Sequence, residues 1–211
     1  MLLEVPPFNL GETYKGKDAD GNLLNPTWLG AVFEFQYGSH TAISRGGKNR
    51  KSARTIKAIA TRNTSGIALL PKRVVQFETT AGLSNLHSVA GYCTVFAGAH
   101  NAIVDDSLPA AGVADDDIFW AIVQGPVLCL VPMVGSSFNG TDIAVGDKLI
   151  ACTAATSQAT SAGRVTNKTF SSVTAGVFDA AVNLIGTALS ARTTGESTGA
   201  VDILVNAQIR Y

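Results

Sequence analysis

Short runs rich in β-branched and aromatic residues alternate along most of this chain with clusters of glycine, asparagine, aspartate and serine. Within several runs, apolar and polar positions alternate, as in AVFEFQYG (31–38) and TIKAIATR (55–62). Such runs are typical of half-buried strands, and the clusters between them are typical of turns. The strands predicted in this way cover 31–38, 55–62, 73–79, 91–98, 119–125, 127–134, 147–154, 163–170, 181–190 and 200–211. We therefore expect an all-β fold, a β-barrel or β-sandwich of short antiparallel strands.

The N-terminal part of the chain departs from this pattern. Residues 1–30 contain three prolines and several turn signals, and their apolar positions have no sustained period. SRGGKNRKSAR (44–54) combines a Gly-Gly pair with dense basic residues, which indicates an exposed loop. We predict an extended N-terminal arm with a basic loop over residues 1–54, followed by a β-rich domain over residues 55–211. The one helix candidate is TTAGLSNLHSVA (79–90), and its glycine weakens it.

The composition limits the class of protein. The chain is 46% hydrophobic and only 15% charged, against roughly 25% charged residues in typical globular domains. Low charge is expected of a tightly packed β protein, and also of a protein whose surface is partly covered by other proteins; both interpretations stay open. The N-terminus lacks a signal-peptide pattern, and the longest apolar segment (118–134) is interrupted by prolines and too short for a membrane span. We therefore expect neither secretion through a signal peptide nor membrane insertion.

The charges are separated along the chain, although the net charge is zero. From Phe35 to Phe77 there are nine basic residues and no acidic ones, and from Glu78 to Asp147 there are eight acidic residues and no basic ones. Opposite patches let copies of one chain associate head to tail, and they can equally pair within one fold. Clustered cations also bind nucleic acid, but the nearby aromatic residues are not interleaved with them as a stacking platform requires. We therefore predict no nucleic-acid partner.

Few residues are suited to catalysis. Cys93 and His100 are close in sequence and form the one candidate nucleophile pair. Cys93 lies in an apolar alternation that points it inward, so we interpret it as a core residue. Cys129 and Cys152 also lie among apolar or small residues, as buried free thiols do. The chain has no nucleophile-elbow, phosphate-loop or zinc-helix motif. We predict no catalytic residue and no cofactor.

Two groups of aspartates, Asp105-Asp106 and Asp115-Asp116-Asp117, offer oxygen ligands of the kind that Ca²⁺ prefers. Neither group has the alternating spacing of a known calcium loop. A solvated loop, or a face that meets a basic partner, is the favoured interpretation, and no metal site is predicted. The residues that we predict to contact a protein partner are basic: Arg45, Lys48, Arg50, Lys51, Arg54 and Lys57.

Several segments follow one another in an order known from one family. ATRNTSGIALLPKRVV (60–75) joins an Asn-x-Ser-Gly turn to apolar residues and a Val-Val pair. DDDIFWAIVQGPVLCLV (115–131) joins aspartates to an aromatic strand, a Gly-Pro pair and a further strand. AVGDKLIACTAATSQATSAGRVT (144–166) precedes NLIGTALSARTTGESTGAVDILV (183–205). In this order the segments resemble the capsid (head) decoration, or cement, proteins of tailed bacteriophages, over about residues 55–211.

The resemblance implies a β-rich virion structural protein without catalytic residues. Such a protein is made in the host cytoplasm, binds the exterior of the assembled capsid and bridges neighbouring subunits of the major capsid protein. It is often a homo-oligomer such as a trimer, and the arm would reach the shell or a sister subunit. The alternative is a tail- or fibre-associated β domain that binds a host receptor or glycan through Trp28, Trp120 and Tyr211, although we expect Trp120 in the core. An enzyme that uses Cys93 and His100 is the third hypothesis.

Overall fold

Strands are the only regular secondary structure in the part of the chain that the computed structural model describes. This part comprises residues 6–36, 55–80, 83–93, 100–131, 142–151, 163–167, 184–192 and 201–209. Its strands are β1 (Val32–Gln36), β2 (Thr55–Asn63), β3 (Val74–Thr80), β4 (Leu83–Tyr92), β5 (Asn101–Val104), β6 (Ile118–Val131), β7 (Lys148–Ala151), β8 (Val165–Asn167), β9 (Leu184–Ala188) and β10 (Val201–Gln208). The predicted all-β fold is confirmed.

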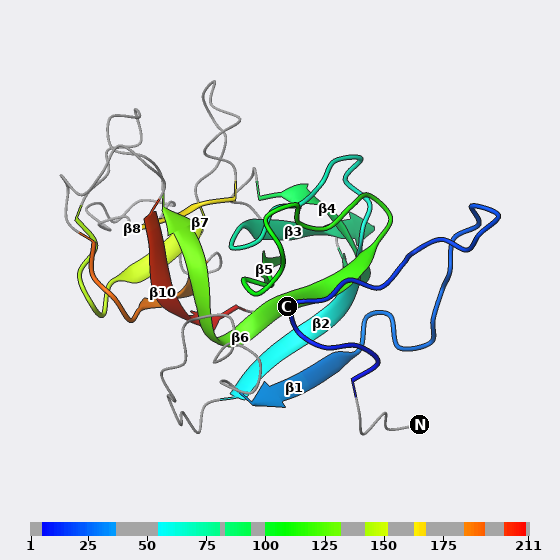
Figure 1. Cartoon of the computed structure of the whole chain (residues 1–211). Coiled ribbons are helices and arrows are strands. Elements are labelled where there is room, and N and C mark those ends of the chain that lie inside the picture. The colour runs from blue at the N-terminus through cyan, green and yellow to red at the C-terminus, as the bar shows by residue number, and fades with distance from the viewer. Residues whose placement is uncertain are drawn as a thin grey trace.

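Five of the strands close into a barrel. Their order is β2-β4-β3-β5-β6, and β6 pairs with β2 to complete the ring (Figure 1). Four of these pairings are antiparallel, and the fifth is a short parallel contact in which Arg62 and Asn63 of β2 meet Ser88 and Val89 of β4. In a closed barrel, every strand pairs with a neighbour on each side over at least part of its length. Unpaired strand edges are a common cause of aggregation in β proteins, and closure removes most of them.

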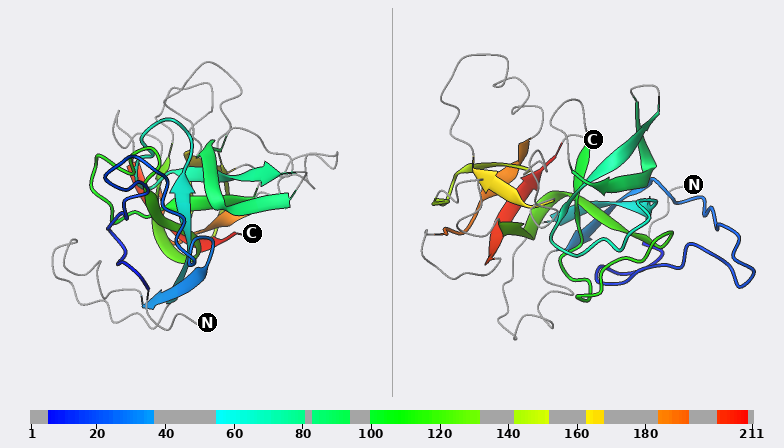
Figure 2. Two further views of the ribbon diagram at one scale, coloured as in Figure 1. Left: turned by 90° about the vertical axis from the view of Figure 1, so that its right-hand side faces the viewer. Right: turned by 90° about the horizontal axis from the view of Figure 1, so that it is seen from above.

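The remaining C-terminal strands extend the sheet from the far half of β6, in the order β10-β9-β7-β8. All of these pairings are antiparallel. Viewed from above, this group lies beside the barrel, and β6 runs from one to the other (Figure 2). The first part of β6 pairs with β2 and β5, and its second part pairs with β10. The two parts of the fold therefore share one long strand.

Gly125 marks the point at which β6 passes from the barrel to the outer strands. Its φ is +104°, and a Cβ there would overlap the carbonyl oxygen of Thr55. A side chain is therefore excluded both by the backbone conformation and by the approach of β2. The sequence predicted two strands, 119–125 and 127–134, whereas the structure has a single strand. The reason is that the residues on both sides of the Gly-Pro pair have partners on β10, because Gln124 lies opposite Gln208 and Val127 lies opposite Val205.

Strand β1 lies on the outside of the barrel and pairs with the first half of β2. Phe33 and Phe35 are buried, whereas Val32 and Glu34 are exposed, as the alternation in the sequence predicted. Both phenylalanines make edge-on contacts with the Trp120 indole, at centroid distances of 5.2 and 5.0 Å. The boundary predicted at residue 54 therefore falls between two paired strands, and β1 contributes Phe33 and Phe35 to the hydrophobic core.

Trp120 lies at the centre of the largest group of aromatic side chains. It is fully buried, as predicted, together with its neighbours Phe119 and Ile118. The first six residues of β6 are all buried, so both faces of this half of the strand are covered. Burying a large apolar side chain stabilises a fold by about 1.5–3 kcal/mol, and this half of β6 is therefore a major source of barrel stability.

The helix candidate over 79–90 is not a helix in the described residues. Thr79 and Thr80 end strand β3, and the residues from Leu83 onward form β4. This segment pairs with β3 on one side and, through Ser88 and Val89, with β2 on the other. The hairpin with β3 and the contact with β2 outweigh the weak helical propensity of a segment that contains a glycine. Strand β5 was not predicted, because four buried residues are too few to show a period.

Candidate functional site

The predicted basic residues belong to the connection between β1 and β2. Arg45, Lys48, Arg50, Lys51 and Arg54 lie outside the described residues. The ends of this connection are fixed, because Gln36, the last residue of β1, lies opposite Thr55, the first residue of β2. The chain therefore leaves and re-enters the sheet at one place. The basic segment is the connection that joins β1 to β2 at the end of the pair marked by Gln36 and Thr55.

Lys57 is the one predicted contact residue that the described part of the chain contains. It lies on β2, directly opposite Glu34 of β1. Its Nζ is 2.9 Å from Glu34 Oε1, and both side chains are partly exposed. Opposite charges across a strand pair stabilise the pairing by a few tenths of a kcal/mol, up to about 1 kcal/mol. Lys57 is therefore part of an ion pair at the base of the basic connection.

Arg62, also from the basic segment, is buried and holds the chain that leads into β1. Its side chain is 6% exposed. One guanidinium nitrogen donates to Asn25 Oδ1 at 3.2 Å, and another donates to the carbonyl oxygen of Leu24. A planar guanidinium with fixed donors suits this double contact. Arg62 therefore has a structural role, which the sequence did not reveal.

The two remaining cations of the basic segment also contact the chain itself. The Arg73 guanidinium lies over the ring of Tyr92, 5.6 Å from its centroid, in a cation–π arrangement. Burial lowers the pKa of Arg73 from its ordinary value. Lys72 forms an ion pair with Asp202 of β10. These contacts hold the two residues that precede β3 against β4 and against β10.

Asp105 and Asp106 follow β5 and bind backbone amides. Asp105 Oδ2 accepts a hydrogen bond from the Gly11 amide at 2.5 Å, and Oδ1 accepts one from the Ser107 amide at 2.9 Å. Asp106 Oδ2 accepts a hydrogen bond from the Leu128 amide of β6 at 2.8 Å. The first aspartate thus binds the N-terminal segment, and the second binds the part of β6 that pairs with β10.

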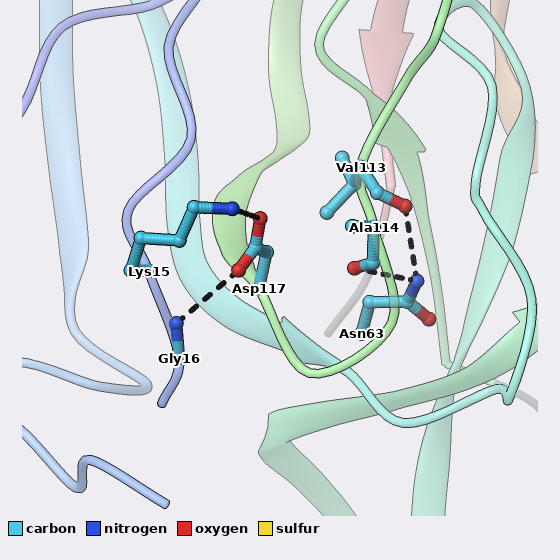
Figure 3. Close-up of polar contacts among 6 residues, drawn as sticks. All are labelled: Lys15, Gly16, Asn63, Val113, Ala114 and Asp117. Carbon is cyan, nitrogen blue, oxygen red and sulfur yellow. Dashed lines mark hydrogen bonds and ion pairs between the residues drawn. The ribbon is translucent and has the colours of Figure 1, made fainter. Parts of the chain in front are cut away.

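The aspartates that precede β6 bind the N-terminal segment in a similar way. Asp117 lies 3.0 Å from the Lys15 ammonium, and its other oxygen accepts a hydrogen bond from the Gly16 amide (Figure 3). Asp116 forms an ion pair with Lys17 at 2.5 Å. Asp115 instead accepts a hydrogen bond from the Gly66 amide at 2.9 Å. The expectation of a solvated loop is therefore incomplete, because Asp117 is buried and all three carboxylates have partners.

Asn63 organises the loop in front of these aspartates. Its side-chain amide donates to the carbonyl oxygens of Val113 and Ala114, at 3.2 and 3.1 Å (Figure 3). It also donates to the carbonyl oxygen of Ile67, at 2.7 Å. Its side-chain oxygen accepts hydrogen bonds from the amide and the hydroxyl of Ser65. Asn63 is fully buried, and its amide thus joins the end of β2 to the segment that leads into β6.

We call residues 6–16 the strap, because this segment crosses the barrel and is fastened at several points. The ring of Phe8 is stacked on the Trp120 indole at a centroid distance of 4.5 Å, and Trp120 Nε1 donates to the Phe8 carbonyl oxygen at 3.2 Å. Leu10 is buried as well. Tyr14 and Ile118 exchange backbone hydrogen bonds, both of 2.8 Å. The strap therefore covers the aromatic core with apolar side chains and is held in place by the aspartates.

Residues 17–23, which we call the finger, project from the body of the molecule (Figure 1). Every residue of the finger is exposed. Asp18 Oδ1 closes its turn by accepting hydrogen bonds from the amides of Asp20 and Asn22, and the bonds from Asn22 are the main reason why the pKa of Asp18 is lowered. At the base, the Leu24 amide donates to the Gly16 carbonyl oxygen at 2.8 Å. The finger is thus an ordered hairpin that starts where the strap ends.

The ion pairs that the described residues show for the acidic segment are made with the N-terminal segment. Lys15 and Lys17 of the N-terminal segment pair with the aspartates before β6, whereas Lys57 and Lys72 pair with Glu34 and Asp202. Five of the nine cations of the basic segment lie outside the described residues.

The residues considered for chemistry lie mainly in the core. Cys93 is 1% exposed and Cys129 is fully buried, in agreement with the prediction of free core thiols, whereas Cys152 lies outside the described residues. Burial raises the pKa of the Cys129 thiol well above its ordinary value, which lowers its reactivity.

Across the described ranges, no group of three or more His, Cys, Asp or Glu residues could hold a metal ion. These ranges also contain no helix that could span a membrane.

The aromatic residues suggested for glycan binding do not form one surface. Trp120 is buried, and Tyr211 lies outside the described residues. Trp28 is half-buried and packs edge-on against Tyr14, with ring centroids 5.3 Å apart. Tyr14 is 39% exposed, so this pair is the accessible edge of the aromatic group that includes Phe8 and Trp120.

Comparison of the chain with protein families, with characterised proteins and with solved structures finds no significant match.

Proposed function

We propose that the protein is a non-enzymatic decoration protein of a tailed-phage capsid, which binds the outer surface of the assembled shell and bridges neighbouring subunits. The proposal starts from the order of segments over residues 55–211 that resembles this family. The closed barrel and its outer strands belong to one hydrogen-bonded sheet, which suits such a role, since decoration requires a defined shape that fits against other proteins.

One observation carries the proposal, namely the place at which the chain of the basic connection leaves and re-enters the sheet, since Gln36 lies opposite Thr55. Residues 37–54 leave and re-enter the sheet at one end of the β1–β2 pair. Arg45, Lys48, Arg50 and Lys51 all belong to this connection. The large groups of carboxylates in residues 105–117 already have partners in the strap and nearby loops. We therefore assign the basic connection to an acidic surface of the shell or of a sister subunit.

Many weak contacts of this kind act together when one protein touches several subunits. Once a copy is bound to one shell subunit, its binding to a second subunit takes place within the same complex. The effective concentration of the second binding site is therefore high. Charge complementarity mainly sets the register and the rate of association, so the binding should weaken as salt is added.

Mixing the purified protein with undecorated heads of the phage that encodes it tests the proposal. We expect co-sedimentation with the heads and a higher temperature of head rupture. Replacement of Arg45, Lys48, Arg50 and Lys51 by glutamine should weaken binding and reduce its dependence on salt. Lys148→Gln, which removes an exposed cation of β7, is the matched control and should bind as the unchanged protein does. Absence of co-sedimentation at low salt would contradict the proposal.

A further inference from the structure

A buried carboxylate lies between the strap and the barrel. Asp105 is 1% exposed. Its two oxygens accept hydrogen bonds from the amides of Gly11, in the strap, and Ser107, in its own turn. Neither of these partners carries a charge, and no ion pair to Asp105 is found in the described ranges. A buried carboxylate held only by neutral donors is costly in its ionised form.

The strap completes the enclosure of this carboxylate. Gly11 packs against the turn so closely that a Cβ there would lie 3.3 Å from the Ser107 carbonyl oxygen. Leu10, the residue before it, is 6% exposed, and Phe8 covers the adjoining Trp120. Lifting the strap would therefore remove the Gly11 hydrogen bond and admit water to Asp105.

The strap can open without breaking the strand pairings of the barrel. It belongs to none of the named strands, and its backbone pairs with the barrel only through the isolated bridge between Tyr14 and Ile118 among the described residues. Segments with little strand pairing open locally at a lower free energy than the core does.

We propose that the strap, residues 6–16, is a detachable segment whose docking on the barrel is coupled to protonation of Asp105. Docking transfers the carboxylate from water to a buried site where its hydrogen-bond donors, among the described residues, are two neutral amides, and a proton removes the charge that makes this transfer unfavourable. The closed strap thus binds a proton more tightly than the open strap does. This coupling is a property of the isolated chain and does not depend on the proposed function.

The direction of the pH dependence follows from the pKa of Asp105. Burial raises this pKa from 3.8 to about 6, while the hydrogen bonds from Ser107 and Gly11 oppose the rise and the charge of Asp106 adds to it. Because the raised pKa belongs to the closed form, closure is favoured below pH 6 and is progressively lost as the pH rises through 6. If opening restores the ordinary value, the fraction of open strap rises about tenfold between pH 5 and pH 7.5.

The other charged groups at this interface do not produce the same effect. The charged residues of the strap are Glu12, which binds Asn9, and Lys15, which pairs with Asp117. Lys17 follows the strap, and its hydrogen bond with Asp116 raises its pKa above the ordinary value, so it stays a cation throughout this pH range. The strap contains no histidine.

Amide NMR of the full-length protein tests the coupling. The Gly11 amide signal should titrate with a midpoint near pH 6, because this amide binds the titrating carboxylate. Hydrogen exchange of the strap amides, corrected for the intrinsic effect of pH, should become about tenfold faster between pH 5 and pH 7.5. Asp105→Asn should abolish both effects. Asp115→Asn is the matched control and should retain them, since Asp115 binds Gly66 and not the strap.

Two outcomes would overturn the proposal. The first is a Gly11 amide signal that does not titrate between pH 4.5 and pH 7.5. The second is a pH dependence of strap exchange that persists in Asp105→Asn. If that variant does not fold, the Gly11 titration in the unchanged protein decides the question by itself.

Discussion

The phenyl ring of Phe8 is stacked on the indole of Trp120, which lies 112 positions later in the chain. The indole N–H donates to the carbonyl oxygen of the same phenylalanine. The contact therefore joins the strap to the centre of β6 both by ring stacking and by a hydrogen bond. It makes residues near the start of the chain part of the barrel core.

Phe8→Ala should lower the free energy of unfolding by about 3 kcal/mol, the lower end of the cost for removing a buried phenyl ring, because Phe8 lies at the edge of the core. The Trp120 fluorescence should also change, because the indole loses its stacking partner. Chemical denaturation followed by fluorescence measures both effects.

Leu23→Ala is the control for this prediction. Leu23 is 49% exposed in the finger, and its truncation should change the stability by no more than about 0.5 kcal/mol. Equal effects of the two substitutions would show that the strap does not contribute to the core.

Gly16→Ala should detach the end of the strap. A Cβ at this position would overlap the carbonyl oxygen of Asp116, which is backbone and cannot rotate away. We expect a loss of about 3 kcal/mol together with faster hydrogen exchange of the strap amides.

Gly21→Ala separates steric overlap from backbone conformation. Gly21 has a φ of +84° at the tip of the finger, but a Cβ there would meet no atom within 4 Å. Its replacement should cost only about 1 kcal/mol, the penalty for a left-handed alanine. A Gly16→Ala variant that is no less stable than Gly21→Ala would contradict the close approach of strap and loop.

Asn63→Asp should be more destabilising than Asn63→Ala. The asparagine amide donates to three carbonyl oxygens, and a carboxylate would place acceptors against those acceptors. Removal of the donors by alanine should cost about 2–3 kcal/mol, because buried carbonyl groups then lose their partner. Urea denaturation of both variants gives the order, and the reverse order would exclude the assigned orientation of the amide.

The ion pair between Lys57 and Glu34 should contribute little to stability. It is partly exposed, and exposed pairs typically contribute about 0.2–1 kcal/mol. A double-mutant cycle with Lys57→Met and Glu34→Gln should give a coupling energy in this range that decreases with salt. A coupling of several kcal/mol would instead mean that the pair is a principal link between β1 and β2.

The sequence predicted the strands where alternation was clear and long enough. β1 and β2 fall almost where the pattern placed them, since one face of each run meets the core. The segment 79–90 was considered as a helix candidate, because its hairpin with β3 and its contact with the more distant β2 leave no clear alternation in the sequence. The Gly-Pro pair in β6 was interpreted as a break between two strands, because its pairing partners lie on β10, far away in the chain.

The roles of the charged residues were harder to predict than the strands. The sequence showed that the aspartates were clustered, but nothing local connects Asp105 with Gly11 or Asp117 with Lys15, which lie about a hundred positions away. Lys15 and Lys17 lie outside the basic block, so the charge pattern along the chain did not indicate that they pair with the aspartates. Asn63 is one of several asparagines in turns, and its three carbonyl partners come from two different loops.

The single strand shared by the barrel and the outer sheet has a mechanical consequence. A force that pulls on β10 acts along a ladder of backbone hydrogen bonds with β6, and β6 transmits it to β2 and β5. Neither part can be drawn away from the other by separating two surfaces, because a continuous backbone crosses the junction. Load applied to the outer strands is therefore distributed over the barrel, and rupture requires many hydrogen bonds to shear together.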